Sequence, residues 1–200
     1  MDETLRKNLV ELRGRAEGEP EFSHENHGER FYRFPLAVAR LSGQVDTLHI
    51  LATQFQFLEL LPLTGRQLAV TGQLRSFNNK SGQGSRLVIT VLARTLRQEE
   101  GEGQNVIHLS GVICKPPILR RTPLGRCICD VMLAVNRRYG RADYLPCIGW
   151  GQVAVTVGHM PVGTPLRLEG RVQSRVYTKL LEDGRSEERT AFEVSIMQLE

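Results

Sequence analysis

The strongest constraint on the fold of this chain is an internal repeat. Residues 8–51 align without a gap onto residues 105–148 at a constant offset of 97, and 12 of the 44 aligned positions are identical. Self-similarity at a fixed spacing indicates two copies of one structural unit. We therefore predict two domains, residues 1–100 and 104–200, joined by an acidic, glycine-containing linker.

Each copy predicts five short β-strands. In the second copy Ile107, Leu109 and Gly111 alternate with polar residues, which is typical of a strand. Transferred to the first copy, this pattern favours a strand from about residue 8, although the leucines there also have helical spacing. The strands expected in the second copy are 105–113, 127–137, 143–150, 165–177 and 189–199.

The order of these elements predicts the fold class. The gap 151–163, between the third and fourth strands, is the one place with room for a short helix. Five strands with at most one such helix are typical of the five-stranded Greek-key barrel of the OB type. We predict an all-β chain made of two tandem barrels of this kind.

Aromatic and basic residues are interleaved at the outward positions of the second copy. Alternate residues from Leu166 to Ser174 are expected to face the barrel interior, which leaves arginines and Tyr177 on the other face. Rings stack on any base while cations follow the phosphates, so the pattern predicts sequence-tolerant, salt-sensitive binding of an unpaired strand. The predicted binding residues are Tyr139, Tyr144, Trp150, Tyr177, Arg137, Arg138, Arg141, Arg171, Arg175 and Lys179.

The first copy lacks these rings. At the repeat-equivalent positions it has small polar residues: Ser42, Thr47, Thr53 and Asn79. We therefore expect the first domain to bind nucleic acid poorly and to serve mainly in assembly or spacing. The residues with which it would make weak secondary contacts are Arg40, Arg75, Phe77 and Lys80.

Other functional classes find little support. The cysteine spacing lacks a zinc knuckle, so we expect no metal site, and neither a cofactor motif nor a nucleophile with a plausible base indicates an enzyme. The longest apolar stretches are far shorter than the roughly 20 residues that cross a bilayer, so no membrane partner is expected. The N-terminus has no secretion signal, which predicts a cytoplasmic protein.

The second copy resembles the bacterial single-stranded DNA-binding proteins. The matching segments are 105–111 (NVIHLSG), 121–125 (RTPLG), 133–138 (LAVNRR), 143–151 (DYLPCIGWG) and 168–175 (LEGRVQSR). The resemblance implies an OB-fold that wraps single-stranded DNA in replication, recombination and repair, at the nucleoid. It also implies that the base-stacking rings fall on Tyr139, Tyr144, Trp150 and Tyr177.

The sequence also departs from that family. Its members usually carry one OB unit, form homotetramers and end in an acidic tail that recruits replication proteins. This chain has two units and stops directly after its last expected strand, so we expect a homodimer supplying four OB units and no tail-mediated recruitment. Two alternatives stay open at this stage: an RNA-binding or primosome-type accessory OB protein, and a protein-interaction adaptor.

Overall fold

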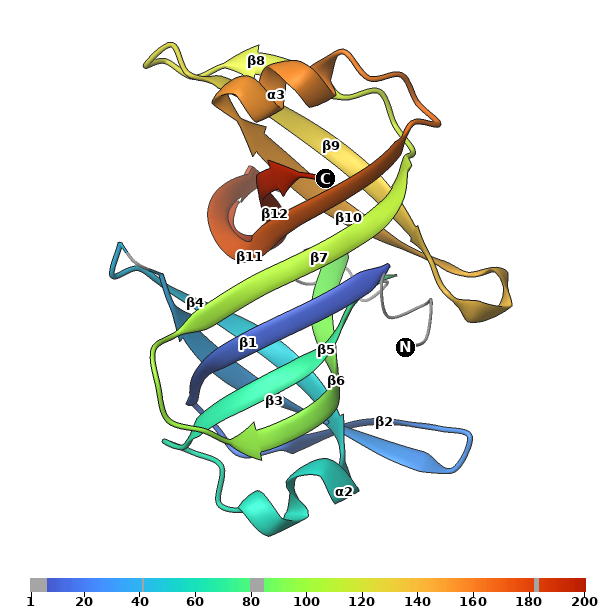
Figure 1. Ribbon diagram of the computed structural model, residues 1–200. Coiled ribbons are helices and arrows are strands. Elements are labelled where there is room, and N and C mark those ends of the chain that lie inside the picture. Colours follow the sequence, from blue (N-terminus) through green and yellow to red (C-terminus); the bar gives the residue numbers. More distant parts are fainter. Residues whose placement is uncertain (1–6, 41, 80–84, 182–183) are drawn as a thin grey trace. The chain divides into compact units, whose positions relative to one another are not determined.

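The computed structural model describes residues 7–40, 42–79, 85–181 and 184–200, and most of them lie in twelve β-strands (Figure 1). The strands of the first repeat are β1 (Asn8–Ala16), β2 (Glu21–Asn26), β3 (Glu29–Ala39), β4 (Val45–Thr53), β5 (Gln67–Asn78) and β6 (Leu87–Gln98). Those of the second repeat are β7 (Gln104–Ile113), β8 (Ile118–Arg121), β9 (Cys127–Asn136), β10 (Ala142–Trp150), β11 (Pro165–Leu180) and β12 (Ser186–Leu199). The helical segments are α2 (Gln54–Phe57), η1 (Leu58–Leu60), η2 (Arg138–Gly140) and α3 (Gly151–Gly158).

The predicted fold class is confirmed. The chain is nearly all β, β1 begins at Asn8 as a strand, and α3 occupies the gap between the third and fourth predicted strands of the second repeat. The short strands β2 and β8 were not predicted. Every residue of both is exposed, so their sequences carry no alternation of apolar and polar side chains from which a strand is recognised.

The same pairings close the sheet in each repeat. In the first, β1 pairs antiparallel with β5 and then with β3, β3 pairs antiparallel with β4, and β4 pairs parallel with β6. In the second, β7 pairs with β9, β9 pairs antiparallel with β10, and β10 pairs parallel with β12. Pairing of the first strand with both halves of the sheet closes an OB-type barrel around an apolar core.

A glycine marks the point where the first strand changes partner. A Cβ atom on Gly14 would lie 2.2 Å from the carbonyl oxygen of Ala37, and one on Gly111 would lie 2.5 Å from that of Ala134. No side chain fits such a close approach of two backbones. The identity of these two glycines in the repeat therefore follows from the geometry of barrel closure.

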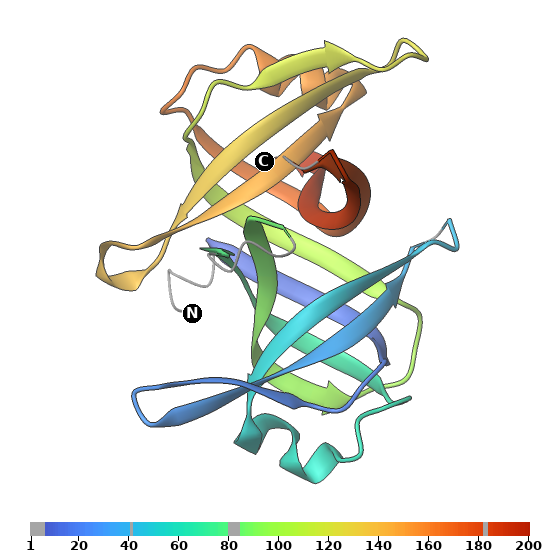
Figure 2. The same cartoon turned by 180° about the vertical axis from the view of Figure 1, so that it is seen from behind.

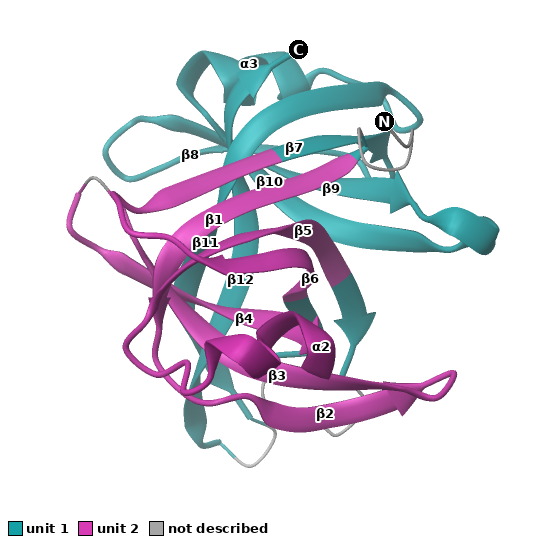
Figure 3. Cartoon of the chain, turned by 60° about the horizontal axis from the view of Figure 1, so that its bottom comes forward, with its two compact units in different colours: residues 1–7, 76–89, 108–200 teal, residues 8–75, 90–107 magenta. Residues whose placement is uncertain are grey.

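Two compact units pack internally (Figure 3). One comprises residues 8–75 and 90–107, and the other comprises residues 1–7, 76–89 and 108–200. We call them the first and second unit. Segment 76–89 comes from the first repeat in sequence but belongs to the second unit. In the described part of the chain, no helix is long and apolar enough to cross a membrane.

Candidate nucleic-acid interface

Strand β10 displays two of the predicted rings. Asp143, Leu145 and Cys147 alternate along the strand and are buried, which turns Tyr144 to the opposite face, where it is 52% exposed. Trp150 ends the strand and is 42% exposed. The two rings do not form one continuous apolar row with Ile148, which the alternation places on their face but which is buried. The rings are therefore separate stacking positions.

The turn between β9 and β10 displays a third ring. Tyr139 is 96% exposed and has a φ of 62°, and the next residue, Gly140, has a φ of 66°. Two successive residues with positive φ are the mark of a tight hairpin turn, and a tyrosine in this conformation is uncommon. Arg138 and Arg141 in the same turn are exposed. This hairpin extends beyond the rest of its unit in both views (Figures 1 and 2).

Strand β11 places its predicted binding residues on one face. Arg171, Arg175, Tyr177 and Lys179 are spaced by even numbers, so their side chains leave the same side of the strand. Arg171 and Tyr177 are half-buried, and the other two are exposed.

Two contacts organise this face of β11. The guanidinium carbon of Arg175 lies 5.8 Å from the centroid of the Tyr177 ring, a cation–π geometry. The Arg175 Nε also lies 3.8 Å from Glu193 Oε2, a carboxylate that accepts a hydrogen bond from Gln173 Nε2 at 2.9 Å. Glu193 thus offsets part of the positive charge beside Tyr177.

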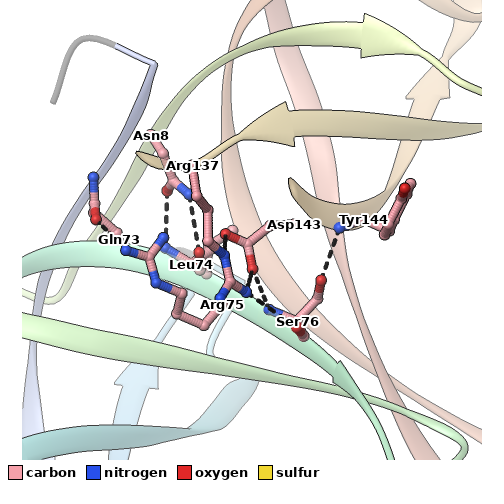
Figure 4. Close-up of polar contacts among 8 residues, drawn as sticks. All are labelled: Asn8, Gln73, Leu74, Arg75, Ser76, Arg137, Asp143 and Tyr144. Carbon is pink, nitrogen blue, oxygen red and sulfur yellow. Dashed lines mark hydrogen bonds and ion pairs between the residues drawn. The ribbon is translucent and has the colours of Figure 1, made fainter. Parts of the chain in front are cut away.

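Arg137 has a different environment from the other predicted cations (Figure 4). Its Nε donates to Asp143 Oδ2 at 2.6 Å, and its Nη2 donates to Asp143 Oδ1 and, at 3.2 Å, to the carbonyl oxygen of Ser76. The Asp143 side chain is fully buried. A buried carboxylate needs such a partner, so this guanidinium neutralises a charge of the protein itself.

Ser76 completes the network around Asp143. The Ser76 amide donates to Asp143 Oδ1 at 2.7 Å, and the Ser76 hydroxyl accepts a hydrogen bond from the Tyr144 amide at 2.7 Å. No local sequence pattern around Asp143 indicates this role. The available signal was the repeat itself, because Arg40 and Asp46 form the same pair in the first unit, with both bonds at 2.6 Å.

The expected secondary residues that the structure describes belong to both units. Arg40 bonds Asp46 and Gln44, and Arg75 donates to Gln73 Oε1 at 2.6 Å. Phe77 is 53% exposed and lies in the second unit. Lys80 lies outside the described residues.

The residues that replace the rings in the first repeat have local roles. Thr47 donates its hydroxyl proton to Glu17 Oε2 at 3.0 Å, and the Thr53 amide donates to Gln56 Oε1 at 2.8 Å at the start of α2. The first unit also carries Phe55 in the first turn of α2, with its ring 89% exposed. Thr47 and Thr53 thus make polar contacts within the first unit at positions where the second repeat has rings.

The four cysteines are free thiols. Burial raises the pKa of the Cys147 thiol to about 12, and burial also raises the pKa values of Cys114 and Cys129. In the part of the chain that the structure describes, no group of three or more His, Cys, Asp or Glu side chains is placed to hold a metal ion. These thiols pack as small apolar side chains.

Comparisons with known proteins agree with this architecture. Residues 104–200 match the model of the single-strand binding protein family. Single-stranded DNA-binding protein B of Bacillus subtilis is 35% identical over 80 residues, which cover 36% of this chain and 71% of that protein. Single-stranded DNA-binding protein 2 of Listeria monocytogenes is also 35% identical over 80 residues, which cover 36% of this chain and 50% of that protein.

A solved structure extends the likeness to nearly the whole chain. The chain spans about half the length of curated relatives such as the Listeria protein. The crystal structure of the wild-type single-stranded DNA binding protein from Thermus aquaticus superposes with a TM-score of 0.72 at 23% identity, covering 96% of this chain and 91% of that one. Both repeats therefore share its fold. With the family match in the second repeat and the Bacillus relative, this shows that the chain belongs to the single-strand binding protein family.

Proposed function

We propose that this chain binds single-stranded DNA, with little sequence preference, through the outward rings and cations of its second unit. The observation that carries the proposal is the exposure of Tyr139, Tyr144 and Trp150 along one β-hairpin. A large aromatic side chain left in water forgoes about 1.5–3 kcal/mol of burial free energy, so three of them together favour a ligand that covers them. Unpaired bases, which stack on rings, are such a ligand.

The charge around the rings supports a polyanionic strand. The cations proposed to follow the phosphates are Arg138, Arg141, Arg171, Arg175 and Lys179, with Tyr177 as the fourth ring. If about four phosphates are neutralised, the logarithm of the affinity falls with the logarithm of the salt concentration with a slope of about −3. A binding rather than a catalytic role, in the protection of single strands during replication, recombination or repair at the nucleoid, fits this site.

The test is a fluorescence titration of Trp150, the single tryptophan of the chain, with dT and rU oligomers at two salt concentrations. We expect quenching by dT, because a base stacked on the indole changes its emission, and weaker binding at the higher salt concentration. Tighter binding of rU than of dT would favour the RNA-binding alternative. Unchanged emission together with unchanged anisotropy of a labelled dT oligomer would refute the proposal.

We also propose the repeat boundary at residues 100–104 as the domain boundary, and a homodimer that supplies four OB units. The support is the tandem repeat itself, since two chains with two units each give the number that single-unit family members reach with four. Light scattering at micromolar concentration is expected to give twice the chain mass of 22.5 kDa. A monomer under these conditions would exclude the dimer.

A further inference from the structure

We infer that the described residues 76–79 and 85–89, here called segment 76–89, form part of the DNA-binding surface of the second unit, although they come from the first repeat. In this inference Phe77 is an additional stacking ring, and Arg137 is a positioning residue that holds the segment in place. The inference rests on the proposed function and deepens it, because it assigns a further binding residue and makes the site depend on both repeats. It makes a second repeat alone an incomplete binding module.

The segment is fixed to the second unit at two separate places. At one end, Ser76 bonds Asp143, Arg137 and the backbone of Tyr144, as described above (Figure 4). At the other end, the Ser85 hydroxyl donates to the carbonyl oxygen of Thr190 in β12 at 2.6 Å. Ser76 is therefore bonded to β10, and Ser85 is bonded to β12.

The anchor at Ser76 limits the distance between the Cα atoms of Phe77 and Tyr144. The Ser76 Oγ lies 2.7 Å from the Tyr144 amide nitrogen. Ordinary bond lengths and the 3.8 Å step between neighbouring Cα atoms then place the Phe77 Cα within about 10 Å of the Tyr144 Cα.

The side chain of Phe77 is available for stacking. Neighbouring side chains in a strand leave opposite faces, so the bond from Ser76 to β10 does not engage the Phe77 ring. Slightly more than half of that ring is exposed. Its exposure equals that of Tyr144, the ring that the proposed function already uses.

The contacts of Arg137 explain why the segment lies there. Its Nε and Nη2 hold the buried Asp143, and the same Nη2 donates to the Ser76 carbonyl oxygen. Loss of this guanidinium removes the ion pair of the buried Asp143 carboxylate and one anchor of segment 76–89. Arg137 therefore acts on DNA through the position of Phe77 rather than as a phosphate contact.

The first experiment replaces the ring in the full-length chain. Phe77→Ala is expected to weaken binding of a long dT oligomer by about 5- to 160-fold, the range for the loss of one stacking ring. Phe55→Ala, which removes a more exposed ring of the first unit, is the matched control and is expected to bind as the unchanged chain does. Wild-type affinity in Phe77→Ala would overturn the inference.

The second experiment separates positioning from phosphate contact through salt dependence. Arg137→Gln is expected to weaken binding with an unchanged salt slope and to speed amide exchange in segment 76–89. Arg141→Gln, the matched exposed arginine, is expected to reduce the slope by about 0.7 without affecting exchange there. A slope reduced in Arg137→Gln to the same extent would overturn the positioning role.

A milder variant tests the inference if Arg137→Gln does not fold. Ser76→Ala removes only the acceptor for the Tyr144 amide, leaves the Arg137–Asp143 pair intact, and is expected to weaken dT binding less than Phe77→Ala does. One set of results would refute this inference and leave the proposed function intact. In it the unchanged chain binds the long dT oligomer, the Tyr144→Ala, Trp150→Ala double variant loses most of that affinity, and Phe77→Ala and Ser76→Ala lose none. Absence of dT binding by the unchanged chain would instead refute the proposed function.

Discussion

At the end of β4 the first repeat places Thr53, and at the equivalent end of β10 the second repeat places Trp150. Both residues precede a helix as its N-cap. The Thr53 amide donates to Gln56 Oε1, whereas no side chain caps α3 at Trp150. The Gln56 side chain thus stabilises the start of α2, whereas the equivalent position of the second repeat displays a ring that is 42% exposed. The proposed DNA binding gives that ring a role.

At some buried positions, in contrast, the two repeats have the same residues and the same contacts. Asp46 and Asp143 are both fully buried and both paired with an arginine six residues earlier, and the glycines at the barrel corner are identical. The repeats therefore agree where backbone geometry or a buried charge leaves no choice. They differ where side chains meet solvent, which is where we propose that DNA binds.

The largest expected effect comes from giving the second repeat the surface of the first. Tyr144→Thr together with Trp150→Thr is expected to cost about 2–6 kcal/mol of binding free energy, because each stacked base contributes about 1–3 kcal/mol. The measurement is the anisotropy of a labelled dT oligomer. Thr47→Ala together with Thr53→Ala in the first unit is the control, and an equal loss there would contradict the assignment of binding to the second unit.

The second prediction concerns the buried carboxylates. Asp143→Ala and Asp46→Ala each leave an arginine without its partner, which costs about 3–5 kcal/mol of unfolding free energy in a buried pair. Urea denaturation of the two variants should give similar losses. Only Asp143→Ala should also weaken dT binding, since Asp143 anchors Ser76. An equal effect of both variants on DNA binding would argue against a special role of segment 76–89.

Much of the fold could be predicted because the repeat supplied a second copy of each pattern. The leucines near the N-terminus have helical spacing, and only the alternation of Ile107, Leu109 and Gly111 in the other copy indicated a strand. Strands β2 and β8 could not be found this way, because neither has a buried face. Periodicity reports burial, and these strands have none.

The candidate site was harder to predict than the fold. The period of β10 and the turn after β9 identified Tyr139 and Tyr144 as outward residues, and both are exposed. The sequence predicts Arg137 as a DNA-binding residue but does not reveal its pairing with the buried Asp143, because no sequence pattern distinguishes an arginine in such a pair from one in solvent. The contacts of Ser76 join residues 67 positions apart in the chain, and no local pattern carries that information.

The third prediction concerns Gly14 and Gly111, at the points where the first strand of each repeat changes partner. Substitution of either glycine should destabilise its repeat to a similar extent. Gly14→Ala and Gly111→Ala each force a Cβ atom against a carbonyl oxygen, and overpacking of this kind costs about 1–3 kcal/mol. Thermal unfolding measures the loss. Gly18→Ala is the control, because its Cβ would meet Pro35 at 3.4 Å, an ordinary contact. Destabilisation of only one repeat would show that the two corners are not equivalent.

The smallest effect is expected at Cys147, whose repeat equivalent in the first unit is the buried Ile50. Burial raises the pKa of the Cys147 thiol from 9.0 to about 12, so the folded chain keeps the proton that the unfolded chain releases. This contribution to stability is complete below pH 9 and is lost as the pH rises from 9 towards 12. At pH 8 a thiol reagent should therefore label Cys147 only through unfolding, and much more slowly than the partly exposed Cys127. Labelling of Cys147 and Cys127 at the same rate would show that the second barrel opens at β10. Cys147→Ile, which introduces the residue found at the equivalent position of the first repeat, should then slow that opening.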